Sequence, residues 1–258
     1  MGSVSIKALH LEDISLNFGG MMALNHCHLS VDVGEKRAII GPNGAGKTTL
    51  FNVITGVLSP SKGLIRLLGE DITPLPTHKR ALKGLARTFQ ITNLFPNLSV
   101  IENVILGIQA LTKTKRIFYR RMASFNTLLD QARSFLADWG LEGKSDIWVR
   151  YLSHGEQRQL EIILALSANP KVLLLDEPSQ GLSTAETAMI IPMIERLDRS
   201  TTVLFIEHDM EVAFQLADKI TVLYFGQVLA EGTVAEIRNN AKVAEVYLGL
   251  EGSHARAF

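Results

Sequence analysis

One stretch of this sequence, residues 41–49, has residue types and a spacing suited to binding a polyphosphate. It reads GPNGAGKTT and fits the pattern G-x-x-x-x-G-K-[ST] at every fixed position. Glycine has no Cβ, so the backbone can approach phosphate oxygens and point successive N–H groups at them. In this pattern Lys47 bridges the β- and γ-phosphates and the Thr48 hydroxyl binds Mg²⁺. The residues that we expect at the nucleotide are Gly41, Pro42, Asn43, Gly44, Ala45, Gly46, Lys47, Thr48 and Thr49.

Two adjacent carboxylates follow an apolar run further along the chain. Residues 171–175 read KVLLL, which is typical of a buried parallel strand, and Asp176 and Glu177 follow it. A second apolar run, residues 202–206, precedes His208. Ligands of α/β sheets bind at the carboxyl ends of the strands, so we expect these side chains on the ligand side. In P-loop proteins Mg²⁺ and the attacking water are held there.

Residues 152–157 read LSHGEQ and lead into an apolar helical pattern, and two interpretations of them stay open. Ser153 and Glu156 fit the capping box S-x-x-E, which only starts a helix. Alternatively, Ser153 and the backbone of Gly155 could offer a helix N-terminus to an anion.

The elements that must position these groups include both strands and helices. Residues 36–40 predict a buried strand that enters the phosphate loop, and apolar residues at helical spacing after the loop predict a helix. Residues 6–18 and 23–33 predict two antiparallel strands, with a break at Gly19-Gly20. Phe18 ends the first of these strands, where it could stack on a nucleotide base or pack in the core.

From residue 91 to about residue 151 the pattern becomes helical, which indicates an inserted helical subdomain. A basic run within it fits a solvated helix face, contact with phospholipid headgroups, or an acidic partner. Its members are Lys113, Lys115, Arg116, Arg120 and Arg121. Elsewhere we expect a short strand at residues 64–68, irregular structure at 71–80 and a short helix at 234–247.

Composition narrows the class of protein. The chain has 258 residues, with 26 Lys and Arg balanced by 26 Asp and Glu, so no overall charge attracts nucleic acid or a lipid surface. Its apolar runs fall far short of the roughly 20 residues that cross a bilayer, so we expect a soluble chain. Cys27 is the only cysteine, which excludes a disulfide framework and fits a reducing cytosol.

Taken in order, these motifs resemble the ATP-binding subunit of an ABC transporter. The ordered set is the phosphate loop, Gln90, LSHGEQ, LLLDEP, residues 181–183 and His208. The resemblance implies a P-loop ABC cassette: a RecA-like mixed α/β sheet core, an antiparallel β subdomain and an inserted helical subdomain. The implied division is 1–90 and 158–258 for the core with its β subdomain, and 91–157 for the helical insert with the signature motif, within one nucleotide-binding domain.

The resemblance also implies a role for each site residue, with ATP and Mg²⁺ as ligands. Phe18 would stack on adenine, and Asp176 and Gln90 would join Thr48 at the metal. Glu177 would act as general base and His208 would contact the γ-phosphate. The signature segment would clamp the ATP of a second, head-to-tail subunit, either identical or a paralogue. Its contacting residues would be Ser153, Gly155 and Glu156.

Two departures from the commonest pattern stand out. The signature is usually LSGGQ, but here His154 and Glu156 occupy the third and fifth positions, and Ser183 stands where Asp is commonest.

Several segments are similar to the uptake branch for branched-chain and other hydrophobic amino acids. These segments are residues 86–90, 98–103, 206–210 and 246–249. Urea and amide importers share most of them, so the substrate stays open.

The resemblance places the chain at the cytoplasmic face of a bacterial inner membrane, bound to transmembrane permease subunits that an extracytoplasmic solute-binding protein serves. No nucleic-acid partner is expected. An exporter-linked cassette of the lipopolysaccharide type and a soluble ABC ATPase acting on nucleic acid remain alternatives. A GTPase is disfavoured, because the sequence has no N-K-x-D motif.

Overall fold

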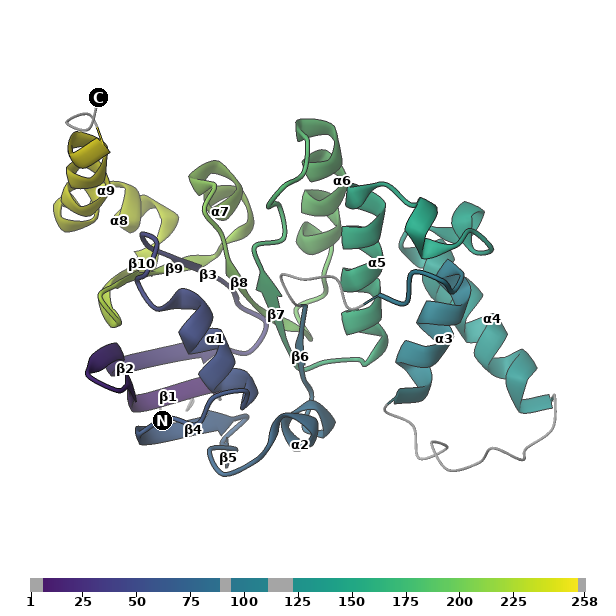
Figure 1. Ribbon diagram of the computed structural model, residues 1–258, viewed down its shortest axis with the longest axis horizontal. Helices are drawn as coiled ribbons and strands as arrows, with labels where there is room; N and C mark the ends of the chain where they lie inside the picture. Colours follow the sequence, from purple (N-terminus) through teal and green to yellow (C-terminus); the bar gives the residue numbers. More distant parts are fainter. Residues whose placement is uncertain (1–6, 89–93, 111–122, 255–258) are drawn as a thin grey trace, which may run out of the picture.

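The fold combines two β-sheets with a set of helices (Figure 1). A computed structural model describes residues 7–88, 94–110 and 123–254. The antiparallel sheet lies at the lower left of the view, the larger sheet in the middle, and helices α3 to α5 on the right. Among the described residues, no helix is both long and apolar enough to cross a membrane.

The larger sheet has six strands in the order β10-β9-β3-β8-β7-β6. All neighbours in it run parallel except β10, which pairs antiparallel with β9. Every residue of β3, β7 and β8 is buried, as their continuous apolar sequences predict. The strand bounds are β3 Lys36–Ile40, β6 Leu85–Arg87, β7 Val172–Asp176, β8 Thr202–Ile206, β9 Lys219–Tyr224 and β10 Gln227–Thr233.

The smaller sheet is antiparallel, in the order β2-β1-β4-β5. Its strands are β1 Lys7–Phe18, β2 Met21–Asp32, β4 Lys62–Leu67 and β5 Glu70–Asp71. The first two confirm the predicted antiparallel pair, and β4 lies close to the strand expected at residues 64–68.

The helices connect the strands and cover the larger sheet (Figure 1). The α-helices are α1 Lys47–Thr55, α2 Thr77–Leu82, α3 Val100–Ala110, α4 Ala123–Asp138, α5 His154–Ser167, α6 Thr184–Glu195, α7 Met210–Leu216, α8 Val234–Arg238 and α9 Ala241–His254. Short 3-10 helices occur at Glu142–Lys144 and Val149–Tyr151.

Two expectations from the sequence were wrong in detail. The stretch expected to be irregular at residues 71–80 ends in helix α2, where Arg80 is buried and its guanidinium donates to the carbonyls of Val53 and Ile54. The single helix expected at residues 234–247 is two helices, because α8 ends at Arg238 and a new helix begins at Ala241.

The hydrophobic core lies on both faces of the larger sheet. Along β3, Ala38 and Ile40 belong to one buried cluster, while Ile39 between them belongs to the other. Side chains alternate between the faces of a strand, so one sheet holds the two clusters together. One cluster includes residues of α3 to α7, and the other includes α1 and the antiparallel sheet.

Helices α3, α4 and α5 pack against one another within and beside the predicted insert. They share a continuous cluster with the larger sheet, including Val104 of α3, Ala132 of α4 and Ile163 of α5. The division at residues 91 and 157 stays a prediction. The basic run at residues 113–121 lies outside the described residues.

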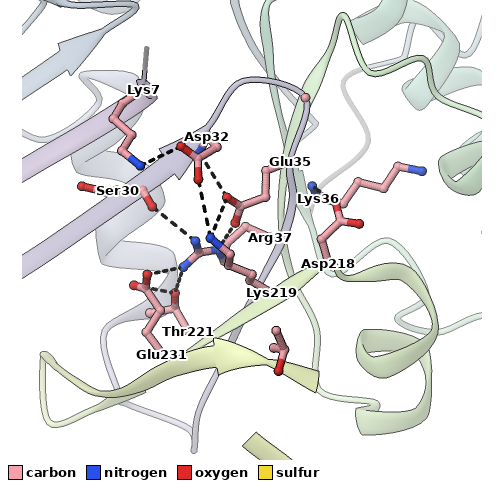
Figure 2. A network of polar contacts seen from close by, with 12 residues as sticks. Lys7, Ser30, Asp32, Glu35, Lys36, Arg37, Asp218, Lys219, Thr221 and Glu231 are labelled. Carbon is pink, nitrogen blue, oxygen red and sulfur yellow. Dashed lines mark hydrogen bonds and ion pairs between the residues drawn. The ribbon is translucent and has the colours of Figure 1, made fainter. Parts of the chain in front are cut away.

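A buried arginine links the two sheets (Figure 2). The side chain of Arg37 on β3 is fully buried and forms ion pairs with Glu35 and, at 2.9 Å, with Glu231 of β10. Its Nη1 also donates to the hydroxyl of Thr221 at 2.9 Å, and its Nη2 to the carbonyl of Ser30 on β2 at 3.2 Å. One guanidinium therefore fastens β2 to β3, β9 and β10.

We expect Arg37→Met to lower the free energy of unfolding by about 3–5 kcal/mol, since it leaves the buried Glu35 carboxylate with only the more distant ammonium of Lys219, at 3.8 Å, as a charged partner. Urea denaturation measures the loss. The double variant Arg37→Met/Glu35→Gln should recover part of it, because it buries no lone charge. An unchanged unfolding midpoint in Arg37→Met would show that the network contributes no stability.

Candidate functional site

The predicted phosphate loop borders a cavity of about 560 Å³. Five segments of the chain line it: the β1–β2 turn, the loop before α1 with the start of that helix, and the residues that follow each of the strands β7, β8 and β9. The lining residues are Phe18, Met21, Met22, Ala23, Asn43, Gly44, Ala45, Gly46, Lys47, Thr48, Thr49, Glu177, His208, Phe225 and Gly226.

The loop between β3 and α1 has the open, glycine-dependent form that phosphate binding needs. Gly41, Gly44 and Gly46 all have positive φ, at 150°, 77° and 101°. A Cβ at Gly41 would collide with the carbonyl of Leu223, and one at Gly46 would lie 2.7 Å from the carbonyl of Ala23. A Cβ at Gly44 would meet nothing within 4 Å, so this backbone faces the space where a phosphate would bind.

Lys47 is held inside the loop that it follows. Its Nζ donates to the carbonyls of Gly41 at 2.6 Å and Pro42 at 3.0 Å. Burial lowers the pKa of this ammonium, while the nearby Glu177 and Asp176 carboxylates raise it. A phosphate oxygen is an anionic acceptor that can take over from the neutral carbonyls.

The two predicted carboxylates leave β7 in different directions. Asp176 is the last residue of the strand, and its Oδ2 accepts from Nη2 of Arg87 at 2.6 Å. Its Oδ1 is buried and has no hydrogen-bond partner among the described residues. Glu177 has a left-handed backbone with φ 49°, and its Oε1 lies 2.7 Å from Nε2 of His208.

Glu207, which no sequence motif marks, binds the loops on both sides of this pair. Its carboxylate accepts from the backbone N–H and the hydroxyl of Ser179, at 3.0 and 2.9 Å, and from the N–H of His208 at 3.3 Å. Burial raises the pKa of Glu207, and these hydrogen bonds oppose the rise. The loop after Glu177 is thereby fixed to the loop that carries His208.

Phe18 lies at the mouth of the cavity with apolar neighbours that the sequence did not reveal. Met21, Met22 and Phe225 are all exposed and line the same cavity. Phe225 and Gly226 form the two-residue turn between β9 and β10, with φ 46° and 75°. Positive φ at both central residues is the signature of a type I′ hairpin, and Gly226 was the only available signal of a turn.

Residues 153–156 do not line the cavity. Ser153 caps α5, and Glu156 completes the capping box, so the helix-initiation interpretation is confirmed. The carboxylate of Glu156 also pairs with Lys144. The N–H of Gly155 donates to Oε1 of Glu186 at 2.8 Å. The structure thus brings Phe18, the phosphate loop, Glu177 and His208 together and keeps the signature segment apart.

Gln90 lies outside the described residues. The strand that leads toward it, β6, places Arg87 next to Asp176 and next to Asn52 of α1, whose Oδ1 accepts from Nη1 at 2.7 Å. The approach to Gln90 is therefore attached to both the phosphate-loop helix and the strand with the carboxylates.

Two family models match this chain. The one described as ABC transporter matches residues 24–180, and the one described as Branched-chain amino acid ATP-binding cassette transporter matches residues 227–252. The chain is 38% identical over 257 residues to the high-affinity branched-chain amino acid transport ATP-binding protein BraF of Pseudomonas aeruginosa. That alignment covers 95% of this chain and 99% of BraF.

Solved structures resemble the whole fold. An ATP-binding cassette of an ABC transporter in its ADP conformation matches with a TM-score of 0.82 and 31% identity, covering 94% of this chain and 99% of that one. A dimeric ATP-binding cassette in a post-hydrolysis state with ADP and Pi matches with a TM-score of 0.74 and 26% identity. This second alignment covers 88% of this chain and 98% of the other.

We expect Lys47→Ala to weaken nucleotide binding by roughly 10- to 150-fold, the equivalent of about 1.5–3 kcal/mol for a charged hydrogen bond. Titration with a fluorescent ATP analogue measures the change. Lys62→Ala is the matched control, because Lys62 is an exposed lysine on β4 that does not line the cavity. Equal affinity in the two variants would contradict the assignment of Lys47.

Proposed function

This chain belongs to the ABC transporter family, and from that premise we propose that it is the ATP-hydrolysing subunit of an importer for branched-chain or other hydrophobic amino acids. The observation that carries the proposal is a phosphate loop facing a carboxylate–histidine pair, in a chain whose C-terminal segment matches a branched-chain amino acid cassette model. The name of BraF, with coverage of nearly its full length, supports the same substrate class.

The cavity suits an adenine nucleotide. The base would stack on Phe18 within the apolar rim of Met21, Met22 and Phe225, a contact worth about 1–3 kcal/mol per base. The phosphates would bind the loop at residues 41–49, with Lys47 leaving its two carbonyl partners for phosphate oxygens.

The residues present also fit Mg²⁺. The buried Asp176 Oδ1 has no hydrogen-bond partner in the described part of the chain, and carboxylate oxygen is a ligand that Mg²⁺ prefers. Thr48 is exposed and lines the cavity, and Asp176 immediately precedes the cavity-lining Glu177. Asp176, Thr48 and Gln90 would hold the ion, which when bound offsets negative charge on the β- and γ-phosphates.

Glu177 and His208 form the pair that would orient the attacking water. The Glu177 side chain is nearly buried, whereas His208 is 41% exposed and faces the cavity. The carboxylate would accept the proton from water, and the imidazole would hold the carboxylate and contact the γ-phosphate.

The signature segment does not line the cavity of its own chain. We therefore include in the proposal a head-to-tail dimer in which Ser153, Gly155 and Glu156 of each subunit belong to the ATP site of the other. The partner would be a second copy or a paralogue. The similarity to a dimeric cassette supports this arrangement.

An exposed aromatic cluster offers a surface for the permease subunits. Phe95, Trp148 and Tyr151 are exposed, and the guanidinium of Arg150 lies 4.2 Å from the Trp148 ring centroid and 4.9 Å from that of Tyr151. A backbone hydrogen bond joins the two segments that carry these residues, because the Arg150 N–H donates to the Pro96 carbonyl. Docking here would place the subunit at the cytoplasmic face of the membrane.

We expect Glu177→Gln to bind ATP, to hydrolyse it about 10²- to 10⁴-fold more slowly, and to accumulate as an ATP-bound dimer. Enzyme assays and size-exclusion chromatography with light scattering measure both effects. Wild-type turnover would remove Glu177 from the mechanism. A variant that stays monomeric with ATP at high protein concentration would remove the clamp by the Ser153 segment.

The importer is tested in proteoliposomes that hold this chain with its permease subunits and solute-binding protein. Leucine is expected to stimulate ATP hydrolysis and to enter the vesicles, with Lys47→Ala as the inactive control. Tyr151→Ser should keep basal hydrolysis and lose the leucine-dependent part. Stimulation by urea or a short amide alone would assign the alternative importer, and export of a lipid-linked saccharide the exporter. Stimulation by DNA or RNA without membranes would overturn transport.

A further inference from the structure

Arg158, on the second turn of α5, contacts the segment that carries the general base. Its Nη2 donates to the carbonyl of Glu177 at 2.6 Å and to the carbonyl of Asp176, and its Nε donates to the carbonyl of Pro178 at 3.2 Å. The guanidinium thus binds three consecutive backbone carbonyls at the end of β7.

The backbone under Glu177 needs such support. Its φ of 49° lies in the left-handed region, which a glutamate rarely adopts and which the surrounding structure must impose. The Glu177 N–H is fixed by the carbonyl of Ile206 at 3.0 Å, and its carbonyl accepts from Arg158 and from the N–H of Gln180 at 3.1 Å. The direction of the carboxylate, which meets His208 at 2.7 Å, follows from this backbone conformation.

Arg158 is itself held rigidly. Its Nη1 forms an ion pair with Oε2 of Glu161 at 2.8 Å, and the two side chains are only 11% and 7% exposed. A guanidinium presents several donors in a fixed plane, so it can bind a carboxylate on one edge and carbonyls on the other. A lysine ammonium at this position has one nitrogen and cannot span the same set.

We propose that Arg158 is a positioning residue that holds Glu177 in its working conformation and ties it to helix α5. The inference rests on the proposed function, because the N-terminus of that helix, at Ser153 and Gly155, would receive the triphosphate of the partner subunit. Arg158 lies one turn beyond this N-terminus. Closure of the dimer onto α5 then acts on the base that serves the chain's own nucleotide.

The test compares Arg158→Met and Arg158→Lys in the full-length protein. We expect Arg158→Met to lower kcat on the order of 100-fold, the effect of a misplaced catalytic group, while KM and the affinity for a fluorescent ATP analogue change less than about twofold. Arg158→Lys should recover part of kcat. Arg66→Met is the matched control: it removes a partly exposed arginine on β4 that pairs with Glu12 at 3.4 Å and does not line the cavity, so it should keep wild-type kcat.

A double-mutant cycle separates positioning from general stability. In the Glu177→Gln background, Arg158→Met should slow hydrolysis little further, because the base that it positions is absent. A similar loss in both backgrounds, or wild-type kcat in both Arg158 variants, would overturn the inference. Thermal denaturation shows whether Arg158→Met folds. If it does not, the inference requires that a folded Arg158→Lys variant has a kcat at least about fivefold below that of the wild type.

Failure of this inference can be told from failure of the proposed function. ATP-dependent dimerisation of Glu177→Gln, with Arg158 intact, tests the dimer alone. If those dimers form but both Arg158 variants turn over like wild type, only the role of Arg158 is wrong. If the dimers never form, the proposed dimer is wrong, and so is the proposed connection from the partner's triphosphate through α5 to Glu177.

Discussion

The site depends on the parallel register of three neighbouring strands. The backbone pairing sets Ile39 of β3 level with Ile206 of β8, and Ile206 level with Asp176 of β7. The next residues of each strand therefore leave the sheet at one edge, as the phosphate loop, Glu177 and the segment with His208. Because the buried β-ladder fixes this alignment, segments more than a hundred residues apart form one cavity, and contacts between the loops, such as those of Glu207 with Ser179 and of His208 with Glu177, add to it.

At the cavity, residues with strained backbones lie next to a fully buried framework. Below the edge, β3, β7 and β8 are fully buried, and Arg37 joins the two sheets through the hydrogen bond from its Nη2 to the Ser30 carbonyl of β2. Above it, Glu177 and Phe225 adopt left-handed backbones. Conformations that cost free energy can persist at a site when the surrounding framework over-determines them. Here Glu207 and Arg158 supply that constraint from neighbouring elements.

Much of this arrangement was predictable, because short-range patterns encode it. The resemblance to an ABC cassette and the α/β fold are confirmed, and so are the phosphate loop between a strand and a helix and the antiparallel pair at the start. The contacts of Arg158, Glu207 and Arg87 were not predictable, since each joins elements distant in sequence. Phe225 was missed because an aromatic residue after a strand gives no sign that its turn faces a cavity. The assigned roles of the site residues stay predictions.

The contact between Gly155 and Glu186 has a consequence for the energetics of the proposed dimer. In the single chain, the amide of Gly155 already has an anionic acceptor, because Glu186 turns one carboxylate oxygen to it and the other to Ser183. The triphosphate of the second subunit would therefore have to displace the Glu186 carboxylate from the Gly155 N–H, because that N–H already has an acceptor. The free energy gained at Gly155 would be the difference between its hydrogen bond to phosphate and its hydrogen bond to Glu186. Because this difference is small, the dimer would reopen once the γ-phosphate is gone.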